Sequence, residues 1–407
     1  MSRLSAPGRT LAVLVGMTLV LGPFGRNGSA GAEDGAASTV GSCSRVPTIE
    51  SALIRGRLTA CGNALVDAMG HRVRLRAYRF NGFLPGNGDA QTCSHWYPPP
   101  SSMAQALRTQ GFNSVFLMLS WANLEPTRPT RRPDGTVVHH WNLGYLRALD
   151  SAIKGFAAHG IAVVLDLAQW KWSPAFTNLD VGGSIVNCGA GMPIWLYPHG
   201  GGIRQMAQAE RRFYGKATTI RSWYLNASKL IARRYAKWSS VVGFVLCWEA
   251  YDLIAKPYLG YRLAPQALHL TRWYEAMGRA IRTFEPRQLL IAPDWQSHDG
   301  RQFALVERPR LPNLMSTFEY YAYAWNQDAR TRLAGYVRRA HDWNAPSWIS
   351  EFNAFGHATT PPGTSPDPNW ASDTAGLLRY AKSVRLSWSI FGSVDARLAK
   401  ILRRWGA

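Results

Sequence analysis

The chain has 407 residues and a formal net charge of +21, with 46% hydrophobic and 17% charged residues. This composition is that of a globular protein and excludes a disordered chain. The basic charge suits an anionic surface or acidic polysaccharide as partner, or a surface adapted to its habitat. A nucleic-acid partner is not expected, because the chain has no zinc-module spacing, RNP motif or basic helical block.

The N-terminus is typical of a secretion signal. Two arginines precede the apolar run Leu11–Leu21, and Ala30-Gly31-Ala32 offers small residues for cleavage. The run is too short to span a bilayer, although a retained anchor is the alternative. We predict a protein secreted to the extracellular space or periplasm, with a signal peptide over 1–32, a flexible leader over 33–60 and one catalytic domain over 61–407.

Export makes disulfides possible for the cysteines of the mature chain. Cys247 lies inside an apolar run and is predicted to be a buried free thiol. The other four allow three connectivities, of which Cys43 with Cys61 and Cys93 with Cys188 is one plausible set.

Eight short apolar or β-branched runs alternate with helical stretches such as 143–160 and 224–238. This alternation predicts a parallel sheet closed into a (β/α)8 TIM barrel, with a long insertion over 170–218. A doubly wound open sheet is the alternative, but the glycine-rich loop expected after its first strand is missing. The predicted strands are 73–80, 113–119, 161–167, 242–249, 289–293, 314–319, 347–351 and 385–390.

Three of these strands end in a carboxylate, at Glu249, Glu319 and Glu351. One such residue alone could be a strand end that meets water. In TIM barrels, however, active sites form at the C-terminal ends of the strands. Two carboxylates about 5 Å apart there can hydrolyse a glycoside with retention, one as nucleophile and one as acid/base. This chemistry needs no metal or cofactor.

Several segments carry a more specific signal: GFNSVFLMLSWANLEP (111–126), HGIAVVLDLAQ (159–169), IARRYAKWSSVVGFVLCWEAYD (231–252), SWISEFNAFG (347–356) and LSWSIFG (386–392). Together they resemble the cellulase-type glycoside hydrolases, family 5 of clan A, over roughly residues 62–395. The resemblance implies Glu249 as acid/base and Glu351 as nucleophile. It also implies that Trp388 floors the −1 sugar site and that Tyr321 lies near the nucleophile.

The sequence departs from the family in the polar residues around the two acids. Phe116 falls where the family has Arg in its second strand, and Ala168 where a His follows the third. Trp248 replaces the Asn before the acid/base, and Glu319 replaces a His on the sixth strand. Either the enzyme accepts a different sugar or pose, or the barrel has kept a sugar-binding cleft and lost catalysis.

Aromatic residues after the strands could form platforms for sugar rings, although each could equally pack in the core. We predict a monomeric, secreted retaining β-glycosidase that acts on a glucan, mannan or related β-linked glycan. The alternatives are a silent carbohydrate-binding barrel and a hydrolase of glycolipid or anionic glycan at a surface. The predicted substrate-binding residues are Trp388, Tyr321, Trp248, Glu319, Trp121, Trp170 and Trp295.

Overall fold

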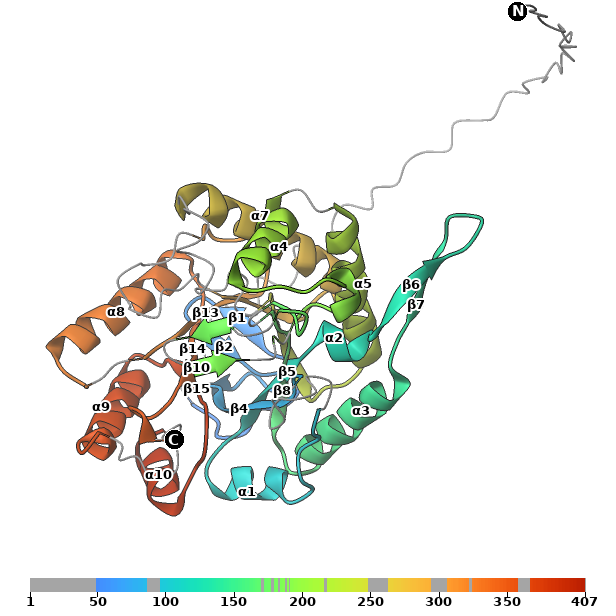
Figure 1. The fold of residues 1–407 in the computed structure, drawn as a ribbon. Coiled ribbons are helices and arrows are strands. Elements are labelled where there is room, and N and C mark those ends of the chain that lie inside the picture. Colours follow the sequence, from blue (N-terminus) through green and yellow to red (C-terminus); the bar gives the residue numbers. More distant parts are fainter. Residues whose placement is uncertain are drawn as a thin grey trace, which may run out of the picture. The chain divides into compact units, whose positions relative to one another are not determined.

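Eight parallel strands close into a barrel in the order β11-β12-β13-β14-β15-β4-β5-β8, with helices packed outside it (Figure 1). The predicted TIM barrel is therefore confirmed. The residues described all belong to one compact unit of the chain, Arg45–Ala407. The computed structural model describes residues 49–85, 96–169, 172–176, 179–181, 184–186, 189, 191–215, 218–247, 263–293, 306–321, 324–357 and 367–406.

Each of the eight predicted apolar runs overlaps a barrel strand. The largest difference is in the fourth, which ends at Val245 instead of continuing to Glu249, because the backbone turns at Cys247 with a φ of 71°. The barrel strands are β4 (Arg76–Phe83), β5 (Ser114–Leu119), β8 (Ala162–Leu167), β11 (Val241–Val245), β12 (Leu289–Pro293), β13 (Leu314–Glu319), β14 (Ser347–Phe352) and β15 (Ser387–Ile390).

Three helices begin at side chains that cap them. Asn142, Asn326 and Asp395 each accept a backbone N–H from the first turn of the helix that follows, which stabilises a helix by about 1 kcal/mol. The helices are α1 (Met103–Thr109), α2 (Trp121–Leu124), α3 (Leu143–Ala158), α4 (Ile203–Gly215), α5 (Thr218–Tyr235), α7 (Leu263–Arg282), α8 (Gln327–Asp342), α9 (Trp370–Ser383) and α10 (Ala396–Ile401), with the short turns η2 (Ile194–Leu196) and η5 (Leu402–Gly406).

Three small antiparallel sheets lie outside the barrel sheet in the described residues. The hairpin β6 (Thr127–Arg131) and β7 (Val137–His140) follows β5, and β9 (Leu179–Val181) pairs with β10 (Ser184–Val186) in the predicted insertion after β8. A three-stranded sheet precedes β4, formed by β1 (Thr59–Cys61), β2 (Ala64–Val66) and β3 (Arg72–Val73).

The sheet β1-β2-β3 closes the N-terminal end of the barrel. Leu58, Leu65 and Val73 belong to the same buried cluster as the side chains of the barrel interior. The chain before this sheet is ordered too, since the Arg72 N–H donates to the Ile49 carbonyl at 3.2 Å. Residues 49–60 of the predicted leader thus contact the sheet β1-β2-β3, and residues 33–48 lie outside the described residues.

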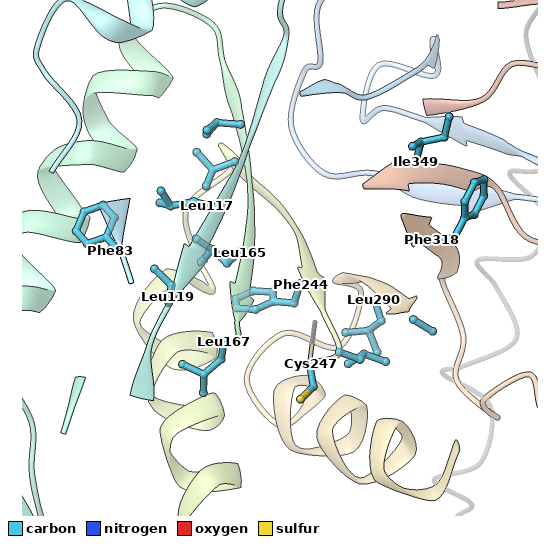
Figure 2. Packing of buried hydrophobic residues seen from close by; sticks show 14 of the residues in the cluster. Phe83, Leu117, Leu119, Leu165, Leu167, Phe244, Cys247, Leu290, Phe318 and Ile349 are labelled. Carbon is cyan, nitrogen blue, oxygen red and sulfur yellow. The ribbon is translucent and has the colours of Figure 1, made fainter. Parts of the chain in front are cut away.

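The barrel strands are apolar on both faces because both faces are buried. On β5, Phe116 and Met118 belong to the interior cluster, whereas the alternate residues Leu117 and Leu119 belong to the layer under the helices. Figure 2 shows these two leucines beside their counterparts on β8. Fully burying one such side chain contributes about 1.5–3 kcal/mol. Continuous apolar runs are expected when helices cover a parallel sheet.

Candidate active site

The site begins with a change of polarity inside the barrel. Along the chain that enters β4, the interior positions alternate from Leu75 and Ala77, which belong to the interior apolar cluster, to Arg79. On β13 the same alternation leads from Met315 to Glu319. The barrel is therefore apolar below and carries charged side chains at the C-terminal ends of its strands, where TIM-barrel active sites form.

Glu351 lies on β14 beside a break in the regular strand register. Phe318 pairs with Ile349, but the next pair is Glu319 with Glu351, so one extra residue of β14 bulges there. Trp348 belongs to the interior cluster and Ile349 to the outer one, so strict alternation would point Glu351 outward. The bulge corrects this and brings Glu351 beside the charged groups of the interior, a common function of bulges near active sites.

The carboxylate of Glu351 has two donors. The Arg79 guanidinium forms an ion pair with Oε2, and the hydroxyl of Tyr321 donates to Oε1. The side chains of Arg79 and Glu351 are only 5% and 8% exposed. Charge-assisted hydrogen bonds of this kind are strong and favour an ionised carboxylate in a fixed orientation.

Arg79 is itself held in place. Its Nε donates to Oδ1 of Asn81 at 3.0 Å, and its guanidinium carbon lies 5.1 Å from the ring centroid of Phe391. Phe391 follows β15, and its backbone N–H donates to the Phe352 carbonyl at 2.9 Å. The Phe391 ring is half-buried, so it offers a partly open aromatic face next to the Arg79–Glu351 pair.

Glu319 is the second buried acid of this group, 8% exposed. It is the register partner of Glu351 on the neighbouring strand, and neighbouring strands run about 4.8 Å apart. The family resemblance places a His here, so this acid changes the charge beside the nucleophile position.

The family model described as "Cellulase (glycosyl hydrolase family 5)" matches residues 66–395 of the chain. The chain belongs to glycosyl hydrolase family 5. This confirms the resemblance and makes the protein a glycoside hydrolase.

Solved structures share the family-5 fold. The chain is similar to a crystal structure of endogalactoceramidase, with a TM-score of 0.62 and 21% identity, covering 86% of this chain and 78% of that one. It is also similar to endo-glycoceramidase II from Rhodococcus sp. as a lactosyl-enzyme intermediate, with a TM-score of 0.61 and 17% identity over 82% and 76% of the two chains. A trimodular family-5 endoglucanase is more distant, with a TM-score of 0.55 and 13% identity over 81% and 60%. No curated protein matched the chain.

Family 5 commonly places an Arg in the second strand, where this chain has Phe116. Phe116 packs inside the barrel, its ring 5.0 Å from that of Trp348. The guanidinium next to Glu351 comes instead from Arg79 on the first barrel strand, in register with Phe116. The nucleophile position therefore keeps an arginine partner, although the arginine that the family has in its second strand is absent.

Trp388 does not floor a sugar site. It is 1% exposed and lies in the outer layer, with ring contacts to Phe112 at 5.8 Å and Phe352 at 6.2 Å. The prediction was wrong because Trp388 pairs in register with Ile349, which also faces the helices. The aromatic ring that does reach Arg79 is Phe391, three residues later.

Trp121 also belongs to the core. It is fully buried, packs against Trp195 and Tyr224, and donates its indole N–H to Glu125 Oε2 at 2.8 Å. The other oxygen of Glu125 lies 2.7 Å from Nδ1 of His139 on β7. The predicted role of Trp121 as a sugar platform is corrected to that of an anchor for the β6–β7 hairpin.

Cys247 is a free, buried thiol, as predicted. Burial and the nearby charge of Asp166 raise the pKa of this thiol well above its usual value. The hydroxyl of Tyr224 lies 3.7 Å from the sulfur. An un-ionised thiol is a poor nucleophile, so Cys247 serves packing behind the end of β11.

Several predicted site residues lie outside the described residues: Glu249, Trp248, Trp170 and Trp295. Cys61 is disulfide-bonded, but Cys43, Cys93 and Cys188 also lie outside the described part, so the connectivity stays a prediction. Within the described part, no helix is long and apolar enough to cross a membrane. The same residues contain no group of three side chains suited to hold a metal ion.

Proposed function

We propose that this family-5 hydrolase is a secreted, retaining β-glycosidase that uses Glu351 as nucleophile and Glu249 as acid/base. The observation that carries the proposal is the pair of donors on Glu351. A nucleophilic carboxylate must be ionised and aimed at the anomeric carbon. The Arg79 guanidinium and the Tyr321 hydroxyl support both requirements.

The proposed reaction has two steps. An oxygen of Glu351 forms a bond to the anomeric carbon while the glycosidic C–O bond breaks and Glu249 gives its proton to the leaving oxygen. Glu249 then takes a proton from water, whose oxygen attacks the anomeric carbon and releases Glu351. The configuration of the sugar is retained because it is inverted twice.

The substrate class we favour is a β-linked glycan such as a glucan or mannan. A specific observation supports glycolipid or anionic glycan as a second candidate. The hairpin β6–β7 follows the C-terminal end of β5, on the rim that carries Glu351, and exposes Arg128, Arg131 and Arg132. Basic side chains attract anionic surfaces over about a Debye length. The similarity to endoglycoceramidases makes glycosphingolipids a direct choice for the test.

Incubation of residues 33–407 with a panel of β-glucans, mannans, xylans, acidic polysaccharides and glycosphingolipids tests the proposal. We expect cleavage of one class by the wild type, read by mass spectrometry, and none by Glu351→Gln. Cleavage of glycolipid alone, weakened by salt and by Arg131→Gln, would favour the second candidate. Sugar binding without any cleavage would reject the enzyme and leave a silent binding barrel.

A further inference from the structure

A hollow lies at the N-terminal end of the barrel, opposite the candidate active site. Its volume is about 310 Å³. Its walls come from the segments that precede β4, β14 and β15, whereas Tyr321 and Phe391 follow the ends of their strands and Glu351 lies near the end of β14. The lining residues are Cys61, Asn63, Ala64, Arg72, His341, Ser383, Val384 and Arg385.

Two arginines, Arg72 and Arg385, line this hollow. Arg72 is only 8% exposed, and burial together with the positive charge of Arg385 lowers the pKa of Arg72. Its Nε is buried and has no hydrogen-bond partner among the described residues. Leaving a buried donor unpaired costs about 1–3 kcal/mol, more when it is charged, so the arrangement favours a ligand that accepts hydrogen bonds and is negative.

The acid that attracts Arg72 does not neutralise the hollow. That acid is Glu50, which already accepts a hydrogen bond from Nε of Arg74 at 2.6 Å. Glu50 also attracts Arg76. The carboxylate of Glu50 thus interacts with three arginines. Arg385 adds a fourth positive charge from the other wall.

Arg385 stands where a smaller residue is usual. It follows α9 with a φ of 59°, and the Leu386 N–H donates to the Ala381 carbonyl at 2.8 Å to end the helix. Glycine is the usual residue at such a position, because a left-handed backbone strains residues with a Cβ. The fold therefore keeps a strained arginine whose side chain lines the hollow, beside the hydroxyl-bearing Ser383 and the imidazole of His341.

We propose that this hollow is a binding site for a phosphate or sulfate group, held between Arg72 and Arg385. Guanidinium groups bind such oxyanions through paired hydrogen bonds. The ring of His341 also lines the hollow and supplies a further donor. The site is separate from the proposed catalytic chemistry and does not depend on which glycan is cleaved.

Titration calorimetry with inorganic phosphate, at constant ionic strength and with chloride as the balancing ion, tests the proposal. The wild type binds phosphate saturably, and Arg385→Gln weakens binding by about tenfold or more, the usual effect of losing a hydrogen bond to a charged group. Arg211→Gln is the matched control, since Arg211 is exposed on α4 and the substitution removes the same charge. It binds phosphate as the wild type does.

Two further arms separate the sources of the ligand. Glycerol phosphate represents a lipid headgroup and glucose 6-sulfate a sulfated glycan, and the tighter of the two identifies the ester. Glycosidase activity stays unchanged in Arg385→Gln. Absence of saturable phosphate binding to the wild type, or equal binding by Arg385→Gln and Arg211→Gln, would overturn the proposal. Arg72→Gln adds a second variant, and if it does not fold, Arg385→Gln decides alone.

Discussion

Arg79 of β4 and Glu351 of β14 form a buried ion pair at the C-terminal end of the barrel. They come from opposite ends of the barrel sequence and meet because β15 alone separates their strands in the closed sheet. The pair joins the first strand to the position that the family uses for its nucleophile. Arg79 also contacts Phe391, so one guanidinium links the acid to an aromatic ring at the site.

Replacing Arg79 by Gln is expected to lower kcat/KM by about 10²-fold, the usual effect of removing a preorganised charge donor. It also breaks the buried ion pair with Glu351, which costs about 3–5 kcal/mol of stability. Loss of the positive charge favours the neutral carboxyl, so the acidic limb of the kcat/KM profile moves to higher pH. Unchanged activity and pH profile in a folded Arg79→Gln protein would show that the ion pair has no catalytic purpose. Arg128→Gln, on the exposed hairpin, is the control.

Tyr321→Phe removes one donor from Glu351 and leaves the ring. A hydrogen bond to a charged group contributes about 1.5–3 kcal/mol, so we expect kcat to fall by roughly 10- to 100-fold. The melting temperature should change little, since Tyr321 is half-buried. Tyr320→Phe is a neighbouring control: its hydroxyl donates to the Ala329 carbonyl at 2.7 Å, away from the acid. A larger loss of activity in Tyr320→Phe than in Tyr321→Phe would contradict the assignment.

Phe391 and Trp388 are expected to respond in opposite ways. Phe391→Ala removes a half-exposed ring at the site and should raise KM or lower kcat with little loss of stability. Trp388→Ala opens a cavity in the outer core, where such a substitution costs about 3–5 kcal/mol. Its melting temperature falls, whereas KM at a temperature where the protein is folded stays near the wild-type value. Thermal unfolding and initial rates for both variants decide, and a KM defect confined to Trp388→Ala would restore the platform first inferred from the sequence.

Asp150 gives the fold a pH-dependent contact between α3 and α5. Burial disfavours its charge, but hydrogen bonds from Arg234, 2.5 Å at Oδ2, and from Tyr235, 2.9 Å at Oδ1, outweigh burial and lower the pKa of Asp150. A lowered folded-state pKa contributes stability above the unfolded value, about 3.9, that is lost as pH falls through the folded value. Asp150→Asn should therefore melt below the wild type at pH 7 and alongside it near about pH 2. A difference in melting temperature that persists at low pH would exclude this ionic origin.

The strands could be predicted because helices cover a sheet that is apolar on both faces. All eight barrel strands overlap predicted runs, and the family follows from those runs and the acids after them. The end of β11 could not be predicted from apolar character. Cys247 continues the apolar run, but its backbone is left-handed. Apolar character alone does not report a turn.

The site was harder to predict because a residue's role depends on which face of its strand the side chain lies on, and not only on its position along the chain. Trp388 lies in the expected strand but on its outer face, and the bulge in β14 that directs Glu351 inward leaves no mark in the sequence. Arg79 did leave a signal. It is the charged member of the alternating set Leu75, Ala77 and Arg79, and the same period would have placed it inside the barrel.

The most direct test of Glu351 as nucleophile is to trap the glycosyl-enzyme intermediate. The protein is incubated with activated 2-deoxy-2-fluoro β-glycosides of the gluco, galacto and manno series, digested and mapped by mass spectrometry. The account predicts one covalently bound sugar per chain, on the peptide that contains Glu351, and no labelling of Glu351→Gln. Labelling of Glu319 instead, or turnover of substrate with inverted configuration and no covalent intermediate, would contradict it.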